Sequence, residues 1–313
     1  MNGTEPLYLR DDMDEAELFA AFNAKNPYYR HIAARFCELA KMLRPGARRF
    51  ADILPRTGYN TRALGNVESV TLIEHRPAFA DYLKTEFQNE PNRRVVRTAL
   101  AVDDLINFIA GPHGFDVSLV CESIAPFAPK YRALAGAAGR AASERSVFGI
   151  TMGPSYHRFA SWKVADFRNG GVVGEGELMS ELSHPVHQAV HRELVRLARE
   201  RHRYDRADAY PPAENALDFT WLRAMNEKAG FPNTVVFEER FAVPGHLVHQ
   251  YCQNGWTFYM RFGALAELRE KNKPAAIALL KEAIENVRGM PQYEAWCKVA
   301  AWHPVGYCFA LRG

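Results

Sequence analysis

The chain has 313 residues, of which 48% are hydrophobic, 24% charged and 12% aromatic, and its formal net charge is +3. These proportions exclude collagen-like, low-complexity and intrinsically disordered chains. No apolar run reaches the ~20 residues of a membrane-spanning helix, and the first residues are polar and acidic, so we expect no membrane contact and no targeting segment. The small net charge gives little reason to expect nucleic-acid binding. Five scattered cysteines without a CxxC pair indicate reduced thiols in a cytoplasmic protein.

Short apolar runs alternate with helix-like stretches along most of the chain. Residues 14–43 carry apolar side chains at helical spacing, and Pro45 and Gly46 end that helix. The apolar runs that predict strands are 48–54, 69–74, 93–100, 115–122, 146–153, 233–243 and 306–313. The helix-like stretches between them are 61–66, 76–90, 103–111, 129–142 and 214–231. This alternation predicts an α/β fold, with a doubly wound, mainly parallel seven-stranded sheet covered by helices on both faces.

Two stretches interrupt the alternation, residues 154–213 and residues 244–303. Because ligands of open α/β sheets bind beyond the carboxyl ends of the strands, insertions on that side usually shape a substrate site. We therefore expect both stretches to form a helical cap. The predicted organisation is N-terminal lid helices over 1–46, a core made of 47–153, 214–243 and 304–313, and the cap.

The turn after the first predicted strand reads DILPRTGYNT over residues 52–61. Here the chain resembles the class I S-adenosylmethionine-dependent methyltransferases, in which an acidic residue and a glycine-rich loop close the first strand. The resemblance continues at Glu74, where the family places the acidic residue that binds the ribose hydroxyls, and at Asp103, where an acidic residue often meets the adenine amine. It covers about residues 30–153, 214–243 and the final strand, and it implies a Rossmann-like methyltransferase fold with S-adenosylmethionine as cofactor.

The family's loop has three glycines, and this chain keeps one of them. Leu54 and Arg56 occupy the first two positions, and Gly58 remains at the third. Glycine lets a backbone approach a ligand closely and adopt positive φ, so bulky residues should reshape the methionine end of the pocket. Two interpretations stay open for Arg56: its guanidinium pairs with the ligand's carboxylate, or the loop no longer admits a nucleotide. Glu74 closes a buried apolar strand, so its carboxylate needs a polar partner. That partner is either the ribose or a protein group such as Arg76 or a helix N-terminus.

The resemblance implies a set of site residues. The cofactor-binding candidates are Tyr28, Tyr29, Asp52, Arg56, Thr57, Gly58, Glu74, Asp103 and Cys121. The candidates for a catalytic base, needed when the acceptor carries a proton, are Glu122, His157 and His187.

Three histidines lie at helical spacing near the start of a basic helix, over residues 184–202. His184, His187 and His191 would share one helix face, but Pro185 makes His184 the cap, and the sequence has no second ligand cluster of similar quality. We predict no metal site. The arginines that follow are interrupted by acids, which favours a solvated helix over a phosphate-binding surface.

The leading hypothesis is a methyltransferase of small-molecule biosynthesis, in which an acceptor attacks the donor's methyl carbon in line. A second hypothesis keeps the cofactor and transfers or cyclises its 3-amino-3-carboxypropyl arm, which releases methylthioadenosine. A third is a non-catalytic binding or scaffolding module with a vestigial site. We expect a small-molecule substrate, no nucleic-acid or membrane partner, and leave a homodimer open.

Overall fold

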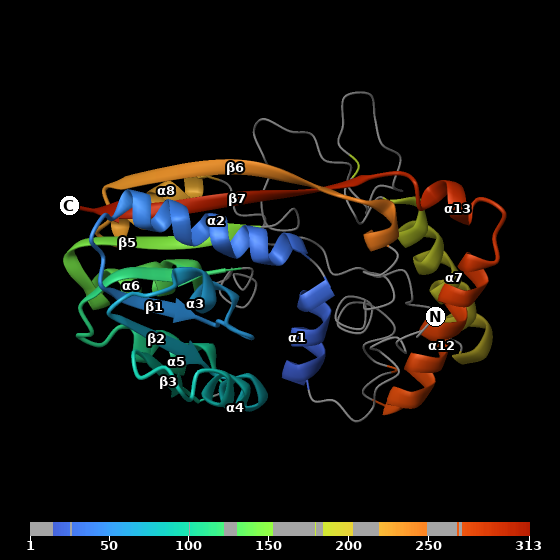
Figure 1. Ribbon diagram of the computed structural model, residues 1–313, viewed down its shortest axis with the longest axis horizontal. Coiled ribbons are helices and arrows are strands. Elements are labelled where there is room, and N and C mark those ends of the chain that lie inside the picture. Colours follow the sequence, from blue (N-terminus) through green and yellow to red (C-terminus); the bar gives the residue numbers. More distant parts are fainter. Residues whose placement is uncertain are drawn as a thin grey trace. The chain divides into compact units, whose positions relative to one another are not determined.

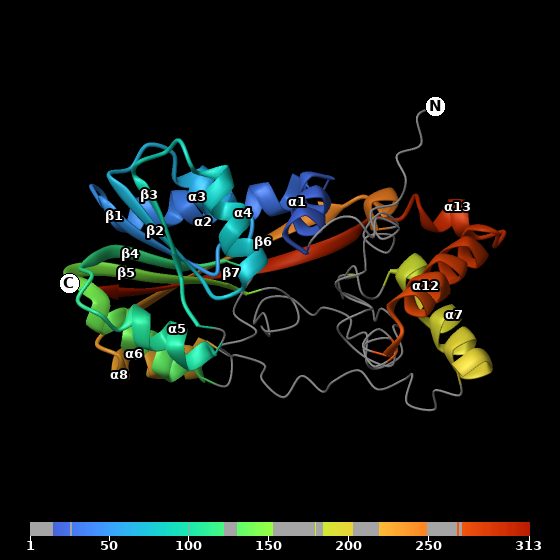
Figure 2. The ribbon, with the colours of Figure 1, turned by 90° about the horizontal axis from the view of Figure 1, so that it is seen from below.

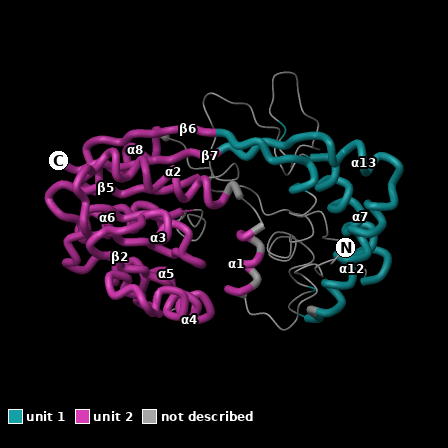
Figure 3. The backbone as a smooth tube through the Cα atoms, viewed as in Figure 1, with its two compact units in different colours: residues 1–13, 159–214, 240–304 teal, residues 14–158, 215–239, 305–313 magenta. Residues whose placement is uncertain are grey.

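The computed structural model describes residues 15–25, 27–99, 101–121, 130–152, 179, 184–202, 219–248, 268 and 271–313. Contacts divide the chain into two compact units (Figure 3). The sheet unit comprises residues 14–158, 215–239 and 305–313, and the helical unit comprises residues 1–13, 159–214 and 240–304. The predicted roles of lid, core and cap stay predictions.

A seven-stranded sheet runs in the order β3-β2-β1-β4-β5-β7-β6 (Figure 1). The strands are β1 Arg49–Ile53, β2 Ser69–Glu74, β3 Arg93–Arg97, β4 Phe115–Val120, β5 Ala142–Met152, β6 Asn233–Val243 and β7 Ala301–Arg312. Parallel pairing joins β1 to β2 and β4, β2 to β3, and β4 to β5, whereas β7 runs antiparallel to β5. The predicted doubly wound, mainly parallel sheet is therefore confirmed.

Helices cover both faces of the sheet (Figure 2). On one face lie α2 Pro27–Leu43, α3 Tyr59–Leu64 and α4 Pro77–Glu86, with α1 Glu15–Lys25 against α4. On the other lie α5 Val102–Ile109, α6 Tyr131–Ala141 and α8 Phe219–Lys228. Every residue of β4 is buried, as expected for a central strand between two helix layers. No helix in the described part of the chain has both the length and the apolar character to cross a bilayer.

The helical unit contains α7 Pro185–His202, α12 Lys273–Arg288 and α13 Tyr293–Trp296. Its buried apolar residues come mainly from the facing sides of α7 and α12, including Val190, Leu197, Leu280 and Ile284. Helical spacing on each element produces these stripes, so the two helices bury them against each other.

Several predicted elements have other bounds in the structure: the strand predicted over 93–100 ends at Arg97, and the strand predicted over 146–153 begins at Ala142. Two further differences are larger. The single helix expected over 14–43 is two helices, α1 and α2. The last strand begins at Ala301 and not at the predicted Gly306. Its pairing with β5 ends where Met152 meets Gly306, so Pro304 lies beyond that ladder, where its missing N–H costs no bond to β5.

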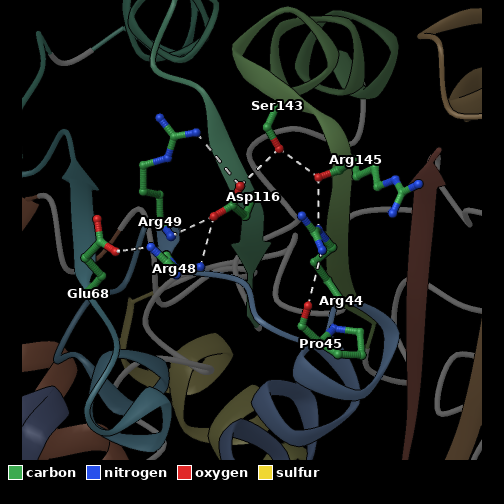
Figure 4. A network of polar contacts seen from close by, with 8 residues as sticks. All are labelled: Arg44, Pro45, Arg48, Arg49, Glu68, Asp116, Ser143 and Arg145. Carbon is green, nitrogen blue, oxygen red and sulfur yellow. Dashed lines mark hydrogen bonds and ion pairs between the residues drawn. The ribbon is translucent and has the colours of Figure 1, made fainter.

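Asp116 joins the starts of three strands at the amino edge of the sheet (Figure 4). Its Oδ2 accepts the backbone N–H groups of Arg48 at 2.9 Å and Arg49 at 3.0 Å, and its Oδ1 accepts the Ser143 hydroxyl at 3.1 Å. Burial alone would raise the pKa of Asp116, but these donors outweigh it and lower the pKa. The carboxylate thus aligns β1, β4 and the start of β5 from below the candidate site.

Candidate functional site

The carboxyl ends of β1, β2 and β4 form the edge at which a ligand is expected. The strands on either side of the β1–β4 pair continue in opposite directions along the sheet, which makes this pair the topological switch point. Open α/β sheets bind ligands in the crevice at that point. The described residues that line this edge are loop 54–58 after β1, Glu74 at the end of β2, and Cys121 directly after β4.

Loop 54–58 has a left-handed backbone at residues that are not glycine. Leu54 has φ 53° and Arg56 has φ 52°, and among the described residues these two are the non-glycine positions with positive φ. Gly58 follows with φ 79°. The loop therefore keeps a glycine-type backbone although two glycines are absent, at a cost of roughly 1–2 kcal/mol for each bulky residue. Such strain persists where the surrounding structure over-determines it, and it concentrates at functional sites.

Gly58 is required by its neighbours as well as by its φ. A Cβ at this position would lie 2.7 Å from the Phe87 ring and 3.2 Å from Leu83 Cδ2. The remaining glycine of the loop therefore lets α3 pack against the end of α4. Its place in the structure is explained without a ligand.

Asp52 holds the start of α3 to the end of β1. The carboxylate is fully buried, and it accepts the Thr61 hydroxyl at 2.6 Å and the Asn60 side-chain amide at 3.2 Å. Burial raises the pKa of Asp52 to about 6, although the bonds from Thr61 and Asn60 work in the opposite direction. Asp52 therefore positions the loop from beneath.

Glu74 binds backbone amides of the protein. Its Oε1 accepts the N–H groups of His75 at 2.9 Å and Arg76 at 3.0 Å, and its Oε2 accepts the Arg56 N–H at 3.3 Å. The residue is 1% exposed. Of the two partners that the sequence left open, the structure contains the protein one, the amides that lead into α4. These three bonds leave one acceptor site on the carboxylate, so a ribose hydroxyl would have to reach that site or replace one of the bonds.

The Arg56 guanidinium lies on an aromatic ring of α1. Its Cζ is 5.0 Å from the centroid of Phe19, and the Phe19 ring meets Phe79 edge to face at 5.7 Å. On the other side, Arg76 Cζ lies 5.3 Å from the Phe79 centroid. Sequence reasoning missed Phe19, because nothing in the pattern of α1 marks it as a neighbour of a loop some 35 residues later. The stack keeps the Arg56 charge beside the loop without a carboxylate partner among the described residues.

Two buried polar atoms in the loop and at the start of α3 have no hydrogen-bond partner in the described structure. They are Thr57 Oγ1 and Asn60 Oδ1. Buried polar atoms are normally bonded, and an exception calls for an explanation such as a ligand. Together with the strained backbone, these atoms fit a polar ligand at loop 54–58.

The other predicted cofactor residues are more scattered. Asp103 lies in the first turn of α5, where its exposed carboxylate pairs with Lys130 Nζ at 2.7 Å. Tyr29 is half-buried in α2, and Cys121 is half-buried after β4. The Tyr28 side chain, Glu122 and His157 lie outside the described residues.

His187 belongs to the helical unit and is fully buried in α7. Burial, with the neighbouring His191 and His184, lowers the pKa of His187 to about 3. A base of that strength takes up little proton near neutral pH. His184 caps α7 as predicted, because its Nδ1 accepts the Val186 amide at 3.3 Å. Within the described ranges no group of histidine, cysteine or acidic side chains could bind a metal ion.

Comparison with known proteins gives structural likeness only. No protein-family model matches the chain, and no curated protein matches its sequence. Among solved structures, the YcgJ protein of Bacillus subtilis has a TM-score of 0.45 at 9% identity, covering 90% of this chain and 98% of that one. A protein of Galdieria sulphuraria, provisionally assigned as a sarcosine dimethylglycine methyltransferase, has a TM-score of 0.42 at 14% identity, with 89% and 84% covered. A phosphoethanolamine N-methyltransferase of Haemonchus contortus, solved with S-adenosylhomocysteine, has a TM-score of 0.42 at 14% identity, with 89% and 52% covered.

The topology of this chain's own sheet defines the class of its fold. The order β3-β2-β1-β4-β5-β7-β6 with an antiparallel β7 is that of the Rossmann-like methyltransferase fold. The chain has this fold.

Proposed function

We propose that the chain is an S-adenosylmethionine-dependent methyltransferase that acts on a small molecule. The observation that supports this most is the state of loop 54–58. It keeps a left-handed backbone at Leu54 and Arg56, and the buried Thr57 hydroxyl beside them lacks a partner. A protein that needed this turn only as a connection would gain stability from glycine at these positions.

When bound, S-adenosylmethionine supplies a methyl carbon made electrophilic by its sulfonium sulfur. In the proposed site, the Arg56 guanidinium pairs with the carboxylate of the amino-acid end, for which its planar fork is suited. Thr57 and Asn60 provide further polar contacts at the same end. Glu74 exchanges one or more backbone bonds for the ribose hydroxyls. Asp52 stays with Thr61 and positions the loop without touching the ligand.

A catalytic base is needed only when the acceptor carries a proton that it must lose. Glu122 and His157 stay candidates for a base, whereas the low pKa of His187 makes it the weakest of the three. Methyl transfer needs mainly positioning, so an acceptor without a proton to lose needs no base at all. A small-molecule acceptor and a cytoplasmic location are part of the same proposal.

One observation favours a second candidate, a non-catalytic module with a vestigial site. Glu74 is sealed by three backbone amides and is almost inaccessible to solvent. If this burial is permanent, the ribose position is closed, and the fold serves as a binding or scaffolding element.

Titration calorimetry with S-adenosylmethionine and S-adenosylhomocysteine separates the two candidates. The enzyme proposal predicts micromolar binding, weakened about 10- to 100-fold in Glu74→Gln, since a hydrogen bond to a charged group contributes about 1.5–3 kcal/mol. Glu227→Gln is the matched control, because Glu227 is exposed on α8. Absence of binding at about 1 mM ligand would reject the enzyme in favour of the module.

If the ligand binds, product analysis identifies the reaction. Release of S-adenosylhomocysteine supports methyl transfer. Release of methylthioadenosine would instead show that the aminocarboxypropyl arm is transferred or cyclised.

A further inference from the structure

Six arginines gather at the amino edge of the sheet, opposite the candidate site. They come from the end of α2, the start of β1, the end of α6, the start of β5 and the end of β7. They are Arg44, Arg48, Arg49, Arg140, Arg145 and Arg312, and we call them the amino-edge arginines. Four of them frame the Asp116 network (Figure 4). All six belong to the sheet unit.

Uncharged carbonyl oxygens fix two of these guanidinium groups in place. Arg44 donates from Nε to the Arg145 carbonyl at 3.1 Å and from Nη1 to the Pro45 carbonyl at 3.2 Å. Arg312 donates from Nη1 to the Gly139 carbonyl at 2.7 Å. These bonds hold the planar forks without cancelling their charge, so an anion would find donors that are already ordered.

These contacts also place the arginines side by side. The Arg44 fork reaches the backbone of Arg145, and Arg312 pairs in register with Ser146, the next residue of β5. The carbonyl that Arg312 binds, on Gly139, directly precedes Arg140. The arginines therefore form one surface around the turn from α6 to β5.

Few carboxylates neutralise this surface. Asp116 is committed to two backbone amides and the Ser143 hydroxyl, and its Oδ1 lies 3.9 Å from Arg49. Arg48 and Glu68 approach to 3.7 Å, but both side chains are largely exposed, so that pair contributes little. Glu144 is exposed among the arginines. Within the described ranges, no ion pair engages Arg140 or Arg145.

An exposed apolar side chain lies close to Arg44 in the sequence. Met42, in the last turn of α2 and two residues before Arg44, is 57% exposed. Arginine and methionine are both enriched in protein–protein interfaces. The exposed aromatic ring in the described part of the sheet unit, Trp221, contacts Tyr131 at the far end of α6 from Arg140, so no base-stacking platform lies at this edge.

We propose that the amino-edge arginines bind a carboxylate-rich segment of another protein, which places an apolar side chain against Met42. The positive, pre-ordered forks match carboxylates, and the methionine gives an anchor that a nucleic-acid backbone would not use. This interaction is independent of the reaction proposed for the opposite edge.

A synthetic peptide of glutamates with interspersed leucines is the probe, with fluorescence anisotropy as the readout. In low salt, the variant Arg44→Gln/Arg145→Gln/Arg312→Gln should bind it about tenfold more weakly than wild type, because it removes three exposed charges that each pair weakly with a glutamate carboxylate. The matched control is Arg94→Gln/Arg132→Gln/Arg223→Gln, which makes the same charge change at exposed positions elsewhere in the sheet unit and should bind like wild type. Met42→Ser should weaken the binding of the leucine-containing peptide and leave the affinity for pure polyglutamate unchanged.

The single variant Arg145→Gln guards against misfolding, because no bond of its side chain supports the fold in the described structure. A severalfold loss of affinity in that variant supports the proposal. Equal losses in the two triple variants would overturn it, since they would show a general charge effect. Tighter binding of a DNA duplex than of the peptide would also overturn it, in favour of a nucleic-acid surface.

Discussion

Replacing Arg56 by glycine and by alanine separates backbone strain from side-chain contacts. Both variants lose the guanidinium and its contact with Phe19, so this loss cancels when they are compared. What differs is the backbone at φ 52°, which glycine adopts freely and alanine does not. The left-handed conformation costs alanine roughly 1–2 kcal/mol. Glycine in turn loses roughly 0.5–1 kcal/mol more conformational entropy on folding.

The balance predicts that Arg56→Gly is more stable than Arg56→Ala by about 0.5–1 kcal/mol. Urea denaturation at neutral pH measures the difference as a shift of the midpoint at constant m-value. Arg192 provides the control, because it is an exposed residue in the interior of α7, where the order should reverse and alanine should be the more stable by roughly 1 kcal/mol. If Arg56→Ala equals or exceeds Arg56→Gly, the loop is not left-handed in solution and the strain argument fails.

Three further outcomes test the site. Burial raises the pKa of Asp52 to about 6, so the folded protein binds more protons than the unfolded chain between about pH 4 and 6. The contribution of Asp52 to the free energy of unfolding, up to about 3 kcal/mol, is therefore present below this window and lost as pH rises through it. Urea denaturation across this pH range should show the free energy of unfolding falling as pH rises, and Asp52→Asn should remove this dependence. Gly58→Ala should cost at least about 2 kcal/mol, because the new Cβ meets Phe87 at positive φ, and a midpoint like that of wild type would contradict this. Thr57→Val should leave the unliganded protein as stable as wild type, or more stable by up to about 1 kcal/mol, and should weaken the binding of S-adenosylhomocysteine. Thr61→Val should destabilise the unliganded protein by about 1–3 kcal/mol, because it removes the bond to Asp52. Destabilisation in both variants would show that the Thr57 hydroxyl has a partner.

The fold could be predicted because its signals are local. Strand β2 over Ser69–Glu74 and β6 over Asn233–Val243 have the predicted bounds, since each is a short apolar or β-branched run between polar turns. The cap of α7 followed from the Pro185 that comes after His184. Element bounds differed where tertiary pairing decides them, as at Pro304 in β7.

The site could be predicted only in outline. The order of residues along β1 and β2 locates Asp52 and Glu74 at strand ends, but it cannot say which donors each carboxylate meets. Glu74 binds the Arg56 amide, which the left-handed loop presents, and that backbone conformation is not expected at Leu54 or Arg56 from local preferences. The ring beneath Arg56 comes from α1, and its contact depends on how that helix packs against α4. Such contacts are long-range, and residue types alone do not encode them.

A crystal structure of the protein grown with S-adenosylhomocysteine tests the central claim most directly. We predict density for the nucleoside beyond the carboxyl ends of β1 and β4, with the Glu74 carboxylate turned from the Arg56 amide towards the ribose and the amino-acid end beside the Arg56 guanidinium. A crevice without ligand density, with Glu74 still bonded to the amides of Arg56, His75 and Arg76, would contradict it.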